Sequence, residues 1–185
     1  MMRRGIIYGL AGILLTLCPL CANADITHNF HTKFNGGTLV SVDATHIRST
    51  NDAIVYTLGG TAELFYDVNH PDGTGAKMCF NLLNNGDCIS TSPSLNKVNG
   101  LTINHLSDKP DNLLSSSYVV VELSLDGSDW SSVTPTVSYS AGLITVEAPE
   151  NNYYVRIRSV SSKKKISLRQ IVYSIGECAC FPYVP

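Results

Sequence analysis

Aromatic and basic side chains gather in the C-terminal third of the sequence, in a pattern that suits sugar binding. Tyr153 and Tyr154 are adjacent, Arg156 and Arg158 follow them, and Trp130 comes after an Asp-Gly turn. Exposed aromatic faces stack on pyranose rings, while neighbouring polar and charged groups hydrogen-bond the hydroxyls. Successive side chains of a regular strand point to opposite faces, so one of the two tyrosines must face outward. We expect the outward tyrosine to contact a ligand.

Each of these residues also has a purely structural alternative. Trp130 could pack against the edge of a sandwich, because a tryptophan after a turn often covers the end of a core. Arg156 and Arg158 share one strand face and could form salt bridges with neighbouring strands. Tyr66 and Tyr139 are two further aromatic candidates.

Motifs for catalysis and for metals are weak. The segment Asp67 to Gly73 resembles a calcium loop, but an EF-hand needs glycine at its sixth position, where Asp72 stands. Ser94 and Lys97 have S-x-x-K spacing without the K-T-G of penicillin-interacting enzymes. The chain lacks the nucleophile-elbow, zincin, P-loop and dinucleotide motifs. We therefore expect no catalytic residue, no metal and no cofactor, with a structural calcium in a loop as the alternative.

The N-terminus has the three parts of a secretory signal peptide. Arg3 and Arg4 supply positive charge, positions 6–17 form an apolar run, and Ala22-Asn23-Ala24 suits cleavage after Ala24. The apolar run is shorter than the roughly 20 residues that span a bilayer. The sequence therefore predicts a signal peptide at 1–24, no integral membrane span, and a soluble mature protein in the periplasm or outside the cell.

Four cysteines remain after the leader is removed: Cys79, Cys88, Cys178 and Cys180. Export places them in an oxidising compartment, so we expect disulfides. Four cysteines allow three pairings, and spacing does not choose among them. A Cys79–Cys88 bridge would clip one hairpin, whereas a ring closed within Cys178-Ala179-Cys180 would be strained.

The net charge of the chain limits the classes of partner that we expect. The chain has 13 basic and 15 acidic residues, and the leader takes two basic residues and no acidic one, which leaves a formal charge of −4. A mildly acidic domain without a basic stripe argues against nucleic acid as a partner.

Period-2 alternation runs through the mature chain, with Gly, Asn, Asp, Ser and Pro between the runs. The strand at 118–125 places Val119, Val121, Leu123 and Leu125 on one face, and the turn 126–129 ends it before Trp130 opens the next strand. Further strands are expected at 26–34, 38–42, 53–58, 62–67, 77–82, 87–91, 98–106, 143–148, 153–160 and 166–173.

The connections between these strands carry their own signals. Pro149 and a turn at 150–152 end the strand at 143–148, and the loop at 161–163 is expected to be a hairpin. The alternation slips at Arg169-Gln170, which indicates a β-bulge. Asn84-Asn85-Gly86 predicts a hairpin turn.

The predicted fold class is therefore all-β: an antiparallel β-sandwich or jelly roll of about ten to twelve short strands at 25–177, followed by an extended tail at 178–185.

The runs VVVELSLDGSDW, YYVRIRS and ISLRQIVY resemble the second half of a galactose-binding-like jelly roll of the discoidin and carbohydrate-binding-module type. Cys88 to Leu95 followed by Leu101-Thr102-Ile103 is similar to secreted modules of Gram-negative polysaccharide degraders, some of which are found beside pectate-lyase-type domains. The resemblance spans roughly residues 53–174. It implies an exported, non-catalytic module that binds a polysaccharide or glycan; the alternatives are a structural protein with an unknown protein partner and an unrecognised polysaccharide-active enzyme.

Overall fold

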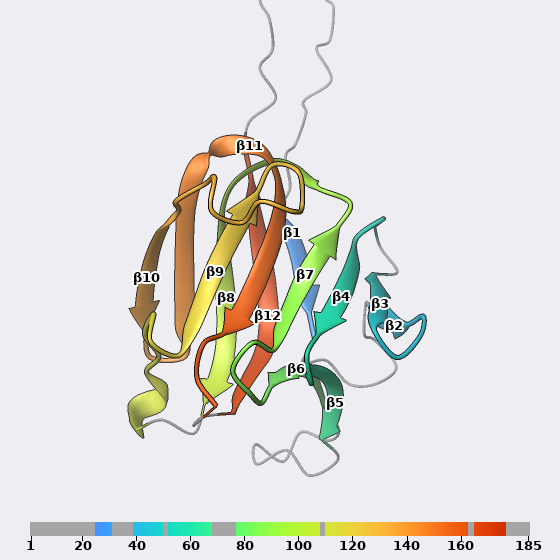
Figure 1. Ribbon diagram of the computed structural model, residues 1–185, viewed down its shortest axis with the longest axis vertical. Coiled ribbons are helices and arrows are strands. Elements are labelled where there is room, and N and C mark those ends of the chain that lie inside the picture. The colour runs from blue at the N-terminus through green and yellow to red at the C-terminus, as the bar shows by residue number, and fades with distance from the viewer. Residues whose placement is uncertain are drawn as a thin grey trace, which may run out of the picture.

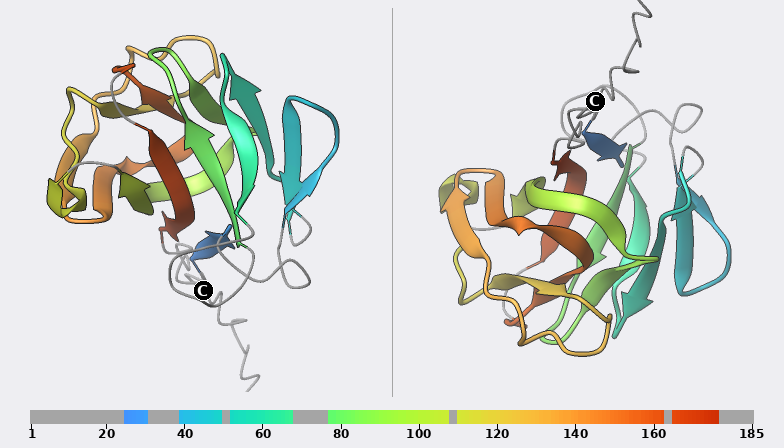
Figure 2. Two further views of the ribbon diagram at one scale, coloured as in Figure 1. Left: turned by 90° about the horizontal axis from the view of Figure 1, so that it is seen from below. Right: turned by 90° about the horizontal axis from the view of Figure 1, so that it is seen from above.

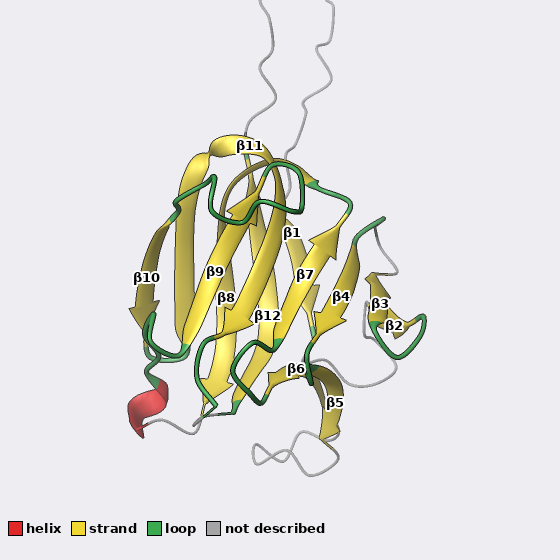
Figure 3. Cartoon of the chain, in the orientation of Figure 1, coloured by secondary structure: helices red, strands yellow, loops and turns green. Residues whose placement is uncertain are grey.

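The computed structural model describes residues 25–30, 39–49, 52–67, 77–107, 110–162 and 165–176. Twelve β-strands and one short 3₁₀ helix, Pro110–Asn112, make up these segments (Figure 3). The strands are β1 (Ile26–Asn29), β2 (Leu39–Ser41), β3 (His46–Ser49), β4 (Val55–Gly59), β5 (Glu63–Asp67), β6 (Lys77–Leu82), β7 (Cys88–Ser92), β8 (Leu95–Ser107), β9 (Val119–Ser124), β10 (Thr136–Ser140), β11 (Leu143–Ser159) and β12 (Ile166–Ile175).

The strands form two antiparallel sheets that face each other (Figures 1 and 2). In sheet A, β10, β11, β8, β12, β6 and β5 pair in that order, and β1 pairs with β12. In sheet B, the order is β2, β3, β4, β7, β11 and β9. The predicted antiparallel β-sandwich is confirmed.

Strand β11 belongs to both sheets. Its first part pairs with β8 and β10, its second part pairs with β7 and β9, and it passes over one end of the molecule between them (Figure 1). Its register shifts between Glu147 and Asn151 and again between Asn151 and Tyr153. The prediction of two strands separated by a turn at Pro149 is therefore wrong: the irregular stretch redirects one strand from sheet to sheet.

The core lies between the sheets and follows the alternation of the strands. Val119, Val121 and Leu123 are at most 4% exposed, as predicted for one face of β9. Leu125 departs from this pattern because it lies beyond the strand end and is 52% exposed. The bulge predicted in β12 is confirmed by a register shift between Leu168 and Gln170.

Two loops that the sequence predicted to be hairpin turns instead connect one sheet to the other. The Asn84-Asn85-Gly86 turn joins β6 of sheet A to β7 of sheet B, so the hairpin prediction is wrong. The carboxylate of Asp87 organises this loop, because it accepts hydrogen bonds from the backbone of Leu83, Asn84 and Thr61. The loop that begins at residue 161 likewise leads from sheet B to sheet A, and positions 163 and 164 lie outside the described residues.

Candidate functional site

The outer surface of sheet B carries a row of polar side chains, one from each of five neighbouring strands. Backbone register places Glu122 opposite Arg156, Arg156 opposite Ser90, Ser90 opposite Thr57, and Thr57 opposite His46. On either side of Glu122, Arg156, Ser90 and Thr57 the strand residues are buried, and Ile47 after His46 is buried too, because side chains alternate across a sheet. We call this outer surface, together with Arg158, Tyr154 and the adjoining loop at 125–135, the B face.

Glu122 binds two guanidinium groups at one end of this row. Nε of Arg156 donates to its carboxylate at 2.6 Å, and Nη2 and Nε of Arg158 donate at 2.6 and 3.2 Å. Partial burial alone would raise the pKa of Glu122, but the hydrogen bonds from Arg158 and Arg156, together with their charges, lower this pKa below its usual value. The salt-bridge alternative for Arg156 and Arg158 is therefore correct, and Glu122 is the partner that sequence reasoning missed.

The ring of Trp130 also contacts Arg156. The guanidinium carbon of Arg156 lies 4.3 Å from the centroid of the Trp130 ring. This is the geometry of a cation–π contact. Trp130 does not open a strand as predicted: it lies in the loop between β9 and β10, where Leu123 makes only an isolated bridge to Val133. The ring is half-buried and covers the arginine.

The adjacent tyrosines point in opposite directions, as predicted. Tyr153 is 2% exposed, and its hydroxyl donates to the carbonyl oxygen of Pro149 at 2.8 Å, so it is a core residue and not a ligand-binding one. Tyr154 lies on the B face and is half-buried. Its ring carbons are 3.2–3.3 Å from the point that a Cβ on Gly127 would occupy, so the turn supports the ring from one side.

The turn at 126–129 has the chemistry that the sequence predicted. Gly127 has a φ of +78°. The Asp126 carboxylate accepts hydrogen bonds from the backbone nitrogens of Ser128 and Asp129, both at 2.8 Å. These hydrogen bonds lower the pKa of Asp126. Glycine and a self-capping aspartate fix such a turn, which is therefore a rigid support beside Tyr154 and Trp130.

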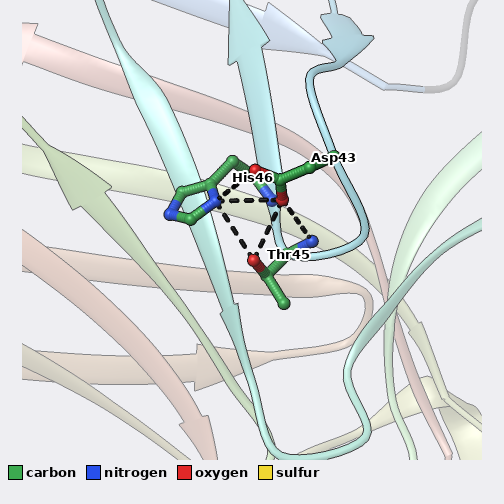
Figure 4. Close-up of polar contacts among 3 residues, drawn as sticks. All are labelled: Asp43, Thr45 and His46. Carbon is green, nitrogen blue, oxygen red and sulfur yellow. Dashed lines mark hydrogen bonds and ion pairs between the residues drawn. The ribbon is translucent and has the colours of Figure 1, made fainter.

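The other end of the row is a capped turn between β2 and β3. The Asp43 carboxylate accepts hydrogen bonds from the backbone and hydroxyl of Thr45 and lies 2.9 Å from Nδ1 of His46 (Figure 4). The backbone hydrogen bond from Thr45, with the bond to His46, lowers the pKa of Asp43 to about 2. A catalytic triad needs the nucleophile and the acid at different imidazole nitrogens. Here Nδ1 of His46 meets both Asp43 and Thr45, so the trio caps the turn instead.

The cysteine prediction is only partly covered by the described residues. Cys79 lies in β6 of sheet A and Cys88 in β7 of sheet B, and their sulfurs are not bonded to each other, so the Cys79–Cys88 bridge, one of the pairings that the sequence left open, is not formed. Burial raises the pKa of the Cys88 thiol, which lies beside the Arg156 and Arg158 positions of the B face. Cys178, Cys180 and the tail lie outside the described residues, as does most of the predicted calcium loop.

A buried polar chain between the sheets was not foreseen. His28 in β1 places Nδ1 2.6 Å from the Tyr56 hydroxyl and Nε2 2.7 Å from the Asp52 carboxylate, and the Tyr56 and Tyr173 hydroxyls are 2.8 Å apart. Burial raises the pKa of both tyrosines, so both remain neutral. These contacts join β1, β4 and β12, and they depend on pairings across long stretches of chain that local alternation does not reveal.

His105 in β8 is the second buried histidine. It is 2% exposed, and neither ring nitrogen has a hydrogen-bond partner within the described segments. Burial, reinforced by the positive charge of Arg169, lowers its pKa from 6.5 to about 4. The imidazole therefore packs as a neutral core group.

Neither a metal cluster nor a membrane-spanning helix occurs among the described residues. Within those segments, no group of three or more His, Cys, Asp and Glu side chains could hold a metal ion. In the same part of the chain, no helix has the length and apolar character needed to cross a membrane.

No protein-family model and no curated protein matches the chain. Among solved structures, the chain is similar to the CBM36-1 domain of a multidomain xylanase from the hindgut metagenome of Trinervitermes trinervoides, with 17% identity and a TM-score of 0.41 over 68% of this chain and 98% of that one. It is also similar to CBM86, a low-affinity xylan-binding module of Roseburia intestinalis, with 10% identity and a TM-score of 0.37 over 68% and 97% of the two chains. The likeness at these scores is one of β fold alone.

Proposed function

We propose that the protein is an exported, non-catalytic carbohydrate-binding module whose ligand lies on the B face. The observation that carries the proposal is the arrangement on sheet B: an outward-facing, half-buried tyrosine, a fixed arginine and hydroxyl groups on neighbouring strands. Tyr154 offers a ring for stacking, and Ser90 and Thr57 offer donors and acceptors for sugar hydroxyls. Together they place a stacking ring and hydrogen-bonding groups on one surface.

Two features of the sequence support the same proposal. The leader at 1–24 suits export, where a glycan ligand would be met. The strand and turn pattern from Val119 to Trp130 resembles galactose-binding-like modules, many of which bind sugars. The carboxylates of the B face also favour a non-catalytic role: Glu122 is engaged by two arginines, and Asp126 and Asp129 by their own turn.

Affinity electrophoresis of the mature protein tests this proposal. We expect retardation by at least one polysaccharide of a plant and host panel, and a loss of about tenfold or more in affinity for Tyr154→Ala. Phe65→Ala is the matched control, because Phe65 is an exposed aromatic (37%) on β5 of the other sheet. Circular dichroism confirms that both variants fold. Absence of retardation across the panel, or equal losses in both variants, would refute the proposal.

A further inference from the structure

The guanidinium of Arg156 is fixed on two sides and open on a third. Its Nε donates to Glu122 at 2.6 Å, and its plane lies against the Trp130 ring at 4.3 Å. Within the described segments, its two terminal nitrogens have no hydrogen-bond partner, although the side chain is only 24% exposed. A half-buried guanidinium whose two parallel terminal N–H donors are unused can still bind an acceptor on a ligand.

Arg158 does not share this property. Both its Nε and its Nη2 donate to Glu122, so its fork is already occupied by a carboxylate. Two guanidiniums therefore share the single carboxylate of Glu122, and within the described segments the terminal nitrogens of Arg156 are left without an acidic partner. The neighbours of Arg156 across the row, Ser90 and Thr57, carry no charge.

The carboxylates of the nearby acids accept hydrogen bonds from other groups. Asp126 accepts hydrogen bonds from Ser128 and Asp129 of its own turn, and Asp129 accepts from the backbone and hydroxyl of Ser131. Burial raises the pKa of Cys88, which favours the neutral thiol beside the arginines. The oxygens of these acids are therefore taken up within their own turn, and the terminal donors of Arg156 are left for a ligand.

From this geometry, and resting on the proposed function, we propose that the glycan bound at the B face carries a carboxylate, and that the terminal nitrogens of Arg156 receive it. Parallel N–H donors of a guanidinium match the two oxygens of a planar carboxylate. Trp130 and Glu122 hold the group in place before binding, which reduces the entropy lost when the ligand docks. Tyr154, on the same surface, would stack on the ring of the acidic sugar.

Two polymers that share a backbone and differ in charge test whether the ligand carries a carboxylate. Affinity electrophoresis at low salt compares polygalacturonate with its fully methyl-esterified form, which keeps the same backbone without the charge. We expect the wild type to bind the acidic polymer about tenfold more tightly, and the preference to shrink as salt is raised. Arg156→Gln should bind both polymers equally. Lys165→Gln should keep the preference, because it removes one positive charge from the other sheet, where Lys165 lies over Phe65.

The outcomes separate this inference from the proposed function. Equal binding of both polymers by the wild type overturns the carboxylate assignment and leaves sugar binding standing. Tighter binding of dextran sulfate than of polygalacturonate also overturns it, because a sulfate ester supplies the same charge on tetrahedral oxygens. If no polysaccharide is bound, the proposed function fails first. Retention of the preference by a folded Arg156→Gln variant would show that another group receives the charge.

Discussion

Replacing Glu122 by glutamine should lower the free energy of unfolding by about 1–2 kcal/mol. The carboxylate accepts three hydrogen bonds from Arg156 and Arg158, and glutamine keeps one acceptor oxygen and turns an NH₂ group toward the guanidinium donors. Removing a charged partner from such a bond costs about 1.5–3 kcal/mol when the remaining group is buried. The side chains of the two arginines are 24% and 32% exposed. Solvent screening therefore reduces that cost.

Thermal unfolding followed by circular dichroism measures the effect. In a domain of this size, about 1 kcal/mol corresponds to about 2–4 °C in Tm, so a loss of about 1–2 kcal/mol should lower Tm by about 2–8 °C. Glu63→Gln is the matched control, because the exposed carboxylate of Glu63 accepts one bond from the neutral amide of Asn81. Its Tm should change by less than about 1 °C. If Glu122→Gln has the same Tm as the wild type, the hydrogen bonds of Glu122 to the two arginines do not stabilise the fold, and this explanation is refuted.

The same pair of proteins has a predicted pH dependence. The folded pKa of Glu122 lies below its usual value of 4.5. Its stabilisation is therefore fully present above that value and is lost as the pH falls through the lowered pKa. The difference in Tm between wild type and Glu122→Gln should shrink in acid. A difference that stays constant from about pH 7 to about pH 3 would contradict the ion-pair explanation.

Three further substitutions test the buried contacts of sheet A. His105→Leu should leave Tm unchanged or higher at about pH 7 and should improve acid resistance, because the folded state excludes a proton that the unfolded chain binds below its ordinary pKa. A fall in Tm of more than about 5 °C would contradict this. His28→Leu should cost about 2–4 kcal/mol in urea unfolding, since it removes two short hydrogen bonds and leaves the Asp52 carboxylate with its bond from the backbone of Ile54 but without a charged or imidazole partner. A loss below about 1 kcal/mol would show that the buried chain contributes little. Gly100→Ala should cost about 1–3 kcal/mol by calorimetry, because the added Cβ overpacks the contact between β8 and β11. That Cβ would lie 2.7 Å from the carbonyl oxygen of Val146. An unchanged Tm would mean that the two strands separate without strain.

Local alternation predicted much of the fold because it depends only on neighbouring residues. The buried face of β9, the outward placement of Arg156 and Arg158, and the bulge before Gln170 follow from period-2 patterns and a break in one of them. The turn at 126–129 follows from the chemistry of aspartate and glycine. These parts carry their structural information within a few residues.

Pairing between distant strands accounts for what the sequence did not reveal. Glu122 sits on the polar side of its strand, but only the antiparallel register of β9 with β11 places it between two arginines. The turn at Asn84-Asn85-Gly86 has the composition of a hairpin, yet its flanking strands find better partners in different sheets. Strand β3 was missed because its four residues alternate too briefly to stand out.

The most direct test of the account locates the ligand on the molecule. Two-dimensional amide NMR of the mature protein, titrated with oligosaccharides of the polymer that retards it most, should show the largest shifts at Ser90, Tyr154 and Arg156 on the B face. Saturable shifts confined to the outer surface of sheet A, around Thr102 and Val172 for example, would contradict the assignment of the B face as the binding surface.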